Sequence, residues 1–410
     1  MSNTYAVPQK AIVFWLSGTT LADLRDIPEV EAFLERSARA ELLPSPITGP
    51  QAQHYQALSG HSPAYFGFFD MLLPRNYSIV EVESGRGATP KLLPDLLRTV
   101  GWTVDYQEVS HLAASVQAWT QSAAASPACL VVKYAVNSPI QDADASSLLQ
   151  ALRLAQAWTG ESGLLAVFSD TQPAPVKRYV NVNNFLADMG IIERDEQSGK
   201  VNWENSLAYY AGHGQIWVNM LGRDAQGAVH PQDEFEEVRA SLAKGLTAKL
   251  LDPETGSAAL ERVYLKEELY SGDYLFCAPD LVAVFNPGYA PSPRSVALQF
   301  DEAVFTSAAD GTTALAGVHP STVTGFFAAT AATLQAGATV YEPEPLTAVV
   351  PTILHALGVE YAGMESAAIN WLFEPGYLET HPIRSNQASQ ELSDEEEELI
   401  IGHLRDLGYV

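Results

Sequence analysis

Cysteine is scarce in this sequence, which has only Cys129 and Cys277 among its 410 residues. Both lie in apolar segments, PACLVV and YLFCAPD, and neither belongs to a pair with the spacing of a metal site. A cysteine-based metal site is therefore excluded. We expect both residues to be buried free thiols.

Basic residues are also few. The chain has 23 Lys and Arg against 49 Asp and Glu, which gives a formal net charge of −26. Such a charge repels the phosphates of nucleic acids and anionic lipids, so we expect no nucleic-acid partner. Solubility is the simplest explanation of the acidity. Attraction of cations or of a basic protein partner is the alternative.

Long apolar runs are absent as well. No segment approaches the roughly 18 consecutive apolar residues that a membrane span needs. The N-terminal segment MSNTYAVPQKAIVFWLSG has one Lys followed by a short apolar run, which is too short for a secretory signal and suits a first core strand. We therefore expect no membrane partner and a cytoplasmic location.

What the sequence does contain is a series of short, continuous apolar runs that end in small or acidic residues. They cover residues 11–18, 128–137, 163–170 and 280–288. Runs of this kind, alternating with helix-like stretches at 90–102 and 143–160, predict a parallel sheet that is covered on both faces. The expected fold class is α/β, with a doubly wound, mostly parallel central sheet and helices on both faces.

Three polar residues follow the predicted strands. Ser17, Asn137 and Asp170 each end a different run. Because the carboxyl ends of parallel strands share one edge of the sheet, where ligands bind in such folds, we expect these residues to converge.

The composition also predicts subdomains. Residues 1–180 form the first part of the core, and 181–264, richer in Asn and acids, form a smaller inserted cap. Residues 265–378 form the second part of the core. Residues 379–410 read as a polar linker followed by a C-terminal helix that begins at Ser393.

Several segments together resemble one known family, the type I phosphodiesterase/nucleotide pyrophosphatase branch of the alkaline-phosphatase superfamily. The matching pieces are YVNVNNFLADMGII (179–192), QIWVNMLGRDAQGAV (215–229), LLDPETGSAALERVYLKEELYSGD (250–273), APDLVAVF (278–285), PTILHALGVEYAGME (351–365) and HLRDLGYV (403–410). The resemblance implies an alkaline-phosphatase-like fold. It also implies a site with two divalent cations, usually zinc, held by Asp and His beside a Thr or Ser nucleophile.

Carried over to this sequence, the family's site is mostly replaced. Its seven positions correspond to Ser17, Thr48, Asn137, Gln141, Asp170, Thr171 and His319. Of these, only Asp170 and His319 are metal-ligating residue types, and Thr48 reaches the nucleophile position only with a two-residue shift from Pro50. Ser17, Asn137, Gln141 and Thr171 are neutral, and neutral side chains hold dications far more weakly than carboxylates and imidazoles.

Three hypotheses follow. The first is a catalytically degenerate member of the family that needs no cofactor and binds a small phosphate-containing ligand or a protein partner. The second is an active metal-dependent phosphoric-ester hydrolase, with zinc or another divalent cation at Asp170 and His319 and with Asp142 or Asp144 recruited. Each acid also has a structural explanation, since Asp170 ends a strand and Asp142 and Asp144 begin a helix. A third option is an assembly subunit whose acidic surface binds a basic partner.

Overall fold

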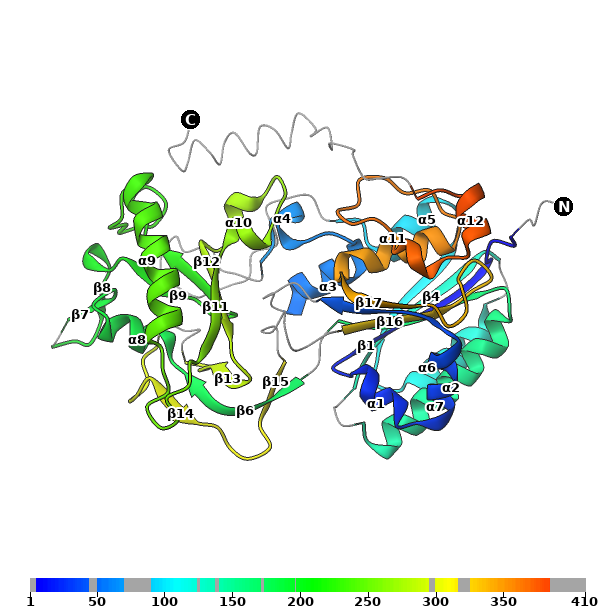
Figure 1. Cartoon of the computed structure of the whole chain (residues 1–410), viewed down its shortest axis with the longest axis horizontal. Helices are drawn as coiled ribbons and strands as arrows, with labels where there is room; N and C mark the ends of the chain where they lie inside the picture. Colours follow the sequence, from blue (N-terminus) through cyan, green and yellow to red (C-terminus); the bar gives the residue numbers. More distant parts are fainter. Residues whose placement is uncertain are drawn as a thin grey trace.

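The chain folds into two lobes, seen side by side in the computed structural model (Figure 1). The structure describes residues 5–43, 50–69, 90–123, 126–136, 140–170, 173–195, 197–294, 299–315 and 325–383. The larger lobe contains a seven-stranded sheet, and the smaller lobe contains the elements between residues 173 and 315.

The sheet of the larger lobe has the strand order β17-β2-β16-β5-β1-β4-β3. Its strands are β1 (Lys10–Ser17), β2 (Ala38–Leu43), β3 (Thr103–Val109), β4 (Ala128–Ala135), β5 (Leu164–Ser169), β16 (Gly325–Thr330) and β17 (Thr339–Pro345). All pair in parallel except β16, which runs antiparallel to both β5 and β2. The predicted α/β fold with a mostly parallel sheet is confirmed.

Helices cover both faces of this sheet because the central strands are apolar on both sides. Alternate residues of β1 belong to two separate hydrophobic clusters, Val13 and Trp15 to one and Ile12 and Phe14 to the other. The first face carries α3 (Pro50–Ser59), α5 (Leu93–Thr99), η5 (Leu346–Ala348), α11 (Val349–Ala356), η6 (Asn370–Leu372) and α12 (Pro375–Thr380). The second carries α1 (Leu21–Arg25), α2 (Pro28–Arg36), α6 (Leu112–Ser122) and α7 (Asp142–Thr159).

The smaller lobe is built from antiparallel and mixed sheets. One sheet has the order β11-β12-β10-β9, from β9 (Ala208–Tyr210), β10 (Gln215–Val218), β11 (Leu260–Leu265) and β12 (Leu281–Phe285). A second contains β6 (Pro173–Val180), β13 (Gly288–Pro291), β14 (Phe305–Ser307) and β15 (Thr313–Leu315), and a pair is formed by β7 (Glu193–Arg194) and β8 (Val201–Asn202). The helices are α8 (Val182–Asp188), η2 (Trp203–Asn205), α9 (Asp233–Lys249), α10 (Lys266–Leu269) and η3 (Leu275–Cys277).

One strand prediction is wrong. The run 280–288 was expected in the large parallel sheet, but β12 pairs antiparallel with β10 and β11 in the smaller lobe. Its continuous apolar sequence has another cause, because its alternate residues fill two clusters within this lobe. After β5, the chain next enters the large sheet at β16. The predicted subdomain limits stay predictions, and Ser393 lies outside the described residues.

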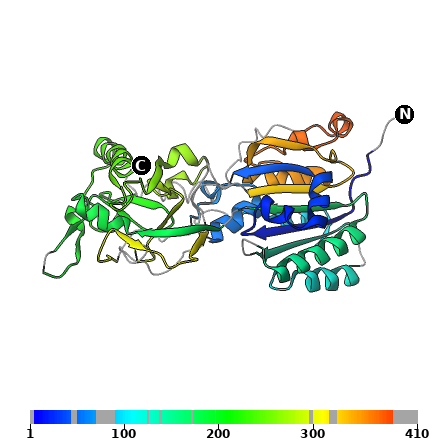
Figure 2. The ribbon, with the colours of Figure 1, turned by 60° about the horizontal axis from the view of Figure 1, so that its bottom comes forward.

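The segment that contains α3 and α4 (Pro63–Phe66) connects the lobes (Figure 2). The Tyr274 backbone N–H donates to the Ala64 carbonyl at 2.9 Å, and the Gln215 side-chain amide donates to the Phe69 carbonyl at 2.8 Å. Ala64 and Phe69 also pack in one apolar cluster with Tyr270 and Tyr274 of the smaller lobe. This segment thus fixes one lobe against the other.

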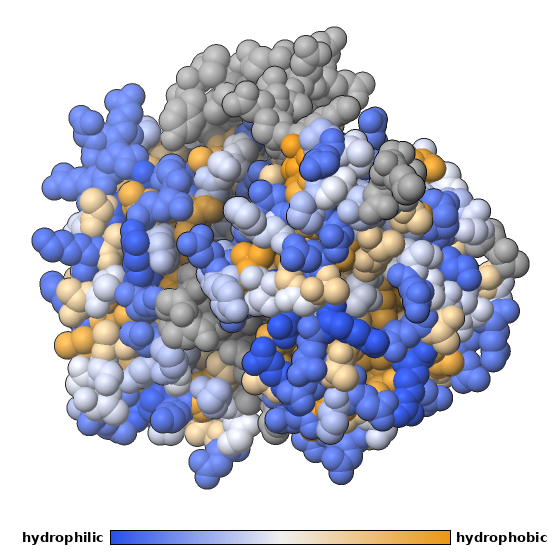
Figure 3. All heavy atoms as spheres, turned by 45° about the vertical axis from the view of Figure 1, so that its right-hand side comes forward, coloured by the Kyte–Doolittle hydropathy of each residue, from blue (hydrophilic) through white to orange (hydrophobic). Residues whose placement is uncertain are grey.

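The surface and the thiols agree with the composition. The face in Figure 3 is mostly hydrophilic, with apolar residues scattered across it. Cys129 and Cys277 are buried thiols, as predicted. Within the described parts of the chain, no helix combines the length and the apolar character needed to cross a bilayer.

Candidate functional site at the strand ends of the large sheet

Three of the seven predicted site positions lie in the described part of the chain: Ser17, Gln141 and Asp170. The other four, Thr48, Asn137, Thr171 and His319, lie outside the described residues. The structure therefore describes only part of the predicted site.

Ser17 and Asp170 lie at the same edge of the large sheet. Ser17 is the last residue of β1, and Asp170 directly follows β5, its parallel neighbour. The end of β4 reaches this edge too, because the Val136 N–H donates to the Ser17 carbonyl at 2.8 Å. The predicted convergence is confirmed for these two residues. Gln141 is an exposed residue at the start of α7.

Asp170 is a buried hydrogen-bond acceptor. It is 1% exposed, and its Oδ1 accepts a hydrogen bond from the Trp15 indole N–H at 2.8 Å. The indole is held in place by Phe168, whose ring stacks on it with centroids 5.9 Å apart and an interplanar angle of 12°. The carboxyl group is thus tied to the core of the lobe by a rigid aromatic donor.

The Trp15 indole belongs to a row of side chains that crosses four parallel strands. Strand register pairs Glu108 of β3 with Lys133 of β4, Lys133 with Trp15 of β1, and Trp15 with Phe168 of β5. The Lys133 ammonium lies 4.5 Å from the centre of the indole ring and 3.5 Å from a carboxyl oxygen of Glu108. A cation is therefore fixed next to the group that holds Asp170.

α3 places His54 over this row. Its Nδ1 lies 3.5 Å from Glu108 Oε1 and 3.4 Å from the Tyr106 hydroxyl, which donates to Glu108 at 2.7 Å. Burial lowers the pKa of His54, and Lys133 lowers it further against the opposing effect of Glu108. The hydrogen bond from Tyr106 holds the pKa of Glu108 below its usual value, helped by Lys133. The arrangement therefore favours a neutral imidazole on His54 and a carboxylate on Glu108.

We call these six residues the strand-end cluster: Trp15, His54, Tyr106, Glu108, Lys133 and Asp170. Of these six residues, only Asp170 is among the seven site positions predicted from the sequence. Lys133 had a signal, because it is the one charged residue in the run ACLVVKYA. Tyr106 and Glu108 had a weaker signal. They follow Val104 at intervals of two residues along β3, so the three side chains lie on one face of the strand.

The described residues do not fit a centre with two dications. Among them, no three His, Cys, Asp or Glu side chains gather where they could hold a metal ion. Ser17 is neutral, and the Lys133 ammonium would repel a dication near Asp170. Asp144 is engaged elsewhere, since its Oδ1 accepts a hydrogen bond from the Tyr134 hydroxyl at 2.5 Å, and Asp142 is an exposed residue of the first turn of α7.

Comparisons with known proteins find likeness in structure and not in sequence. No protein-family model and no curated protein sequence matches the chain. Human ectonucleotide pyrophosphatase/phosphodiesterase 5 superposes with a TM-score of 0.55 and 13% identity over 92% of this chain and 100% of that one. An inactive variant of the murine protein, in complex with AMP, gives a TM-score of 0.55 and 14% identity over 89% and 100%. The chain therefore has the alkaline-phosphatase-like α/β fold of these phosphodiesterases.

Proposed function

We propose that this chain is a phosphodiesterase-like protein that has lost the two-metal centre and binds a small phosphate-containing ligand beside the strand-end cluster. One observation carries the proposal. The buried carboxyl of Asp170 accepts a hydrogen bond from the Trp15 indole, and the same indole lies against the Lys133 ammonium. A neutral donor and a cation therefore stand close to the carboxyl that, in the family's pattern, would hold metal.

The replacements in the sequence support the same conclusion. Ser17, Asn137, Gln141 and Thr171 keep polar side chains while lacking the charge or the imidazole of the family's ligands. A polar pocket of this composition can persist without metal ions. With Lys133 beside it, such a pocket offers an anion both hydrogen bonds and one positive charge.

The choice of ligand class rests on Lys133 and on the fold. The structure of the similar murine protein was determined in complex with AMP. In this chain the Lys133 side chain is about one quarter exposed, so a phosphate group can reach its ammonium from solvent. Charge-assisted hydrogen bonds of this kind are about twice as strong as neutral ones.

AMP titration by calorimetry tests the proposal with two matched variants. Lys133→Met removes the cation and keeps the aliphatic stem. Its control is Lys10→Met, because the Lys10 ammonium also lies over an indole, 4.9 Å from the Trp158 ring centre, at the opposite end of β1. We expect Lys133→Met to weaken AMP binding about tenfold, because one hydrogen bond to a charged group is lost. We expect Lys10→Met to leave AMP binding unchanged.

Two results would contradict the proposal. One is AMP binding with the same affinity in wild type and Lys133→Met. The other is turnover of AMP-containing diesters that depends on added zinc, which the alternative hypothesis of an active hydrolase predicts.

A further inference from the structure

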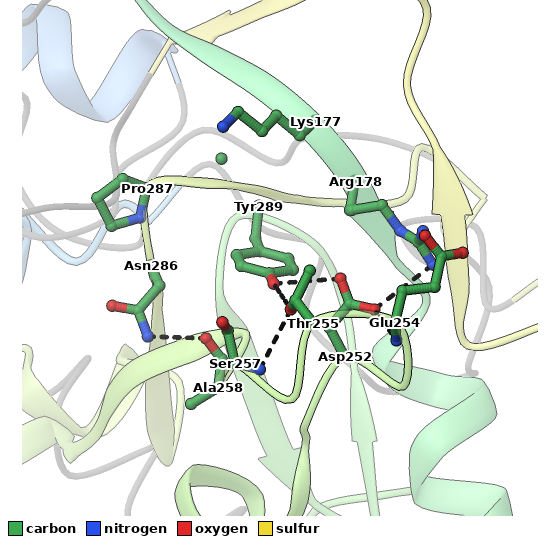
Figure 4. A pocket seen from close by; sticks show the side chains of 11 residues that line it. Lys177, Arg178, Asp252, Glu254, Thr255, Ser257, Ala258, Asn286, Pro287 and Tyr289 are labelled. Atoms are coloured by element: carbon green, nitrogen blue, oxygen red, sulfur yellow. Dashed lines mark hydrogen bonds and ion pairs between the residues drawn. The ribbon is translucent and has the colours of Figure 1, made fainter.

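The smaller lobe contains a cavity that is separate from the strand-end cluster. It has a volume of about 570 Å³, within the range of roughly 300–1,000 Å³ that is typical of ligand pockets. Its walls come from β6, from the turn 252–258 and from the segment 286–289 that enters β13 (Figure 4). We call it the small-lobe cavity. It contains none of the residues used in the proposed function.

One wall of the cavity is an ion-paired network. Arg178 contacts Asp252 at 3.6 Å and forms a close ion pair with Glu254. The Tyr289 hydroxyl donates a hydrogen bond to Asp252 Oδ2 at 3.2 Å. The Thr255 hydroxyl lies 3.2 Å from the Tyr289 hydroxyl. Because the Tyr289 proton is already used, Thr255 is the donor of that second hydrogen bond. These contacts fix the Tyr289 ring, which lies between Lys177 and the turn that carries Thr255 in Figure 4.

The remaining polar groups have hydrogen-bonding capacity to spare. The structure gives no partner among the described residues for the Lys177 ammonium or the Ser257 hydroxyl, and both residues are exposed. The Asn286 amide donates to the Ala258 carbonyl at 2.9 Å, which leaves its carbonyl oxygen as an acceptor. The cavity thus offers a donor, an acceptor and a hydroxyl that can act as either.

The turn that carries Ser257 is held in shape by its own backbone. The Asp252 N–H donates to the Ser257 carbonyl and the Gly256 N–H to the Asp252 carbonyl, both at 2.8 Å. A wall fixed in this way loses little conformational freedom when a ligand binds.

The charges select against most ligand classes. Lys177 and Arg178 balance Asp252 and Glu254, so the lining is neutral in sum, and the protein as a whole carries −26. A charged ligand of either sign gains no net attraction from the lining, because the charges of Lys177 and Arg178 offset those of Asp252 and Glu254. An apolar ligand would displace water from Lys177, Ser257 and Asn286 without replacing the hydrogen bonds that this water makes to them.

We propose that the small-lobe cavity binds a neutral carbohydrate. Each sugar hydroxyl both donates and accepts, so it can bond to Lys177, to Ser257 and to the Asn286 carbonyl oxygen without any charge penalty. The Tyr289 ring supplies the flat apolar surface on which the C–H face of a sugar packs. This proposal is independent of the one for the strand-end cluster.

Saturation-transfer NMR on the full chain tests the proposal directly. The probes are glucose, galactose, mannose, N-acetylglucosamine, maltose, lactose and cellobiose at millimolar concentration. We expect transfer to at least one of them. Ser257→Tyr places a large ring in the cavity at an exposed position and abolishes that transfer.

A matched pair of variants measures the role of Lys177. Lys177→Met removes the ammonium donor from the cavity and weakens sugar binding about tenfold. Lys200→Met removes an exposed lysine elsewhere in the same lobe and leaves sugar binding unchanged. Circular dichroism of each variant confirms that the lobe is folded.

Three outcomes would overturn the proposal. They are the absence of transfer to every sugar, transfer that survives Ser257→Tyr, and binding of AMP or inorganic phosphate that is lost in Lys177→Met while no sugar binds. Because AMP binding at the strand-end cluster depends on Lys133, failure here leaves that proposal untouched.

Discussion

Replacing Trp15 by phenylalanine isolates the hydrogen bond that holds Asp170. The smaller ring can still stack on Phe168, but the N–H donor, 2.8 Å from Asp170 Oδ1, is lost. Both Trp15 and Asp170 are 1% exposed, so water has little access to replace the donor. Loss of this bond at a buried polar atom costs about 1–3 kcal/mol.

Two smaller effects add to this loss. The void left by the shorter side chain costs about 1 kcal/mol at roughly 24 cal/mol per Å³ of cavity. The weaker contact of Lys133 with the ring costs about 0.5 kcal/mol. We therefore expect Trp15→Phe to lower the free energy of unfolding by about 2.5–4.5 kcal/mol.

The assay is denaturant unfolding followed by circular dichroism, with hydrogen exchange of β1 and β5 to report on the larger lobe. Trp119→Phe is the control, because Trp119 is 8% exposed and its indole N–H has no hydrogen bond among the described residues. Both proteins are measured with and without a chelator. The claim that the Trp15 indole holds Asp170 is refuted if Trp15→Phe lowers the free energy of unfolding no more than Trp119→Phe does. It is also refuted if Trp15→Phe lowers that free energy only when metal is present.

Two further predictions concern other buried groups. Burial lowers the pKa of His61 from 6.5 to about 4. As the pH falls, this histidine is therefore protonated in the unfolded chain before it is protonated in the folded one. The free energy of unfolding should drop between pH 6.5 and 4, by up to about 3 kcal/mol. His61→Phe keeps the stacking on Tyr65 and should flatten the dependence of the free energy of unfolding on pH in this range. The control His230→Gln, at an exposed position, should leave that dependence unchanged. Equal slopes in the wild type and both variants would contradict the argument. Asp280→Asn should destabilise the smaller lobe by about 3–5 kcal/mol, because Asp280 is 0% exposed and binds Arg223 through both oxygens. Hydrogen exchange of β10 and β12 measures this change, and unaltered protection would disprove it.

The sequence predicted the centre of the large sheet well, for a clear physical reason. β1, β4 and β5 are buried on both faces, so they read as continuous apolar runs, and α7 ends at Gly160 as its pattern predicts. β17 was missed because it is the exposed edge of the sheet and has a polar sequence, TVYEPEP. β12 was misplaced because burial between two clusters of the smaller lobe gives the same apolar signature as burial in a parallel sheet.

The candidate site was predictable only where it depends on strand ends. Ser17 and Asp170 meet because parallel strands end at one edge, which the order of runs and polar ends already indicates. The neighbours of Asp170 depend instead on which residue of β1 lies opposite which residue of β4 and β3. That register is set by packing between distant parts of the chain, so a single sequence gives no sign that Trp15, Lys133 and Glu108 form one row.

Zinc content tests the central claim, the loss of the two-metal centre, most directly. The purified chain is saturated with zinc, desalted and measured by inductively coupled plasma mass spectrometry, and a generic aryl phosphodiester is assayed in parallel. The account predicts well under one zinc per chain and no metal-dependent turnover. Two tightly held zinc ions per chain, with turnover that disappears in Asp170→Asn, would contradict it.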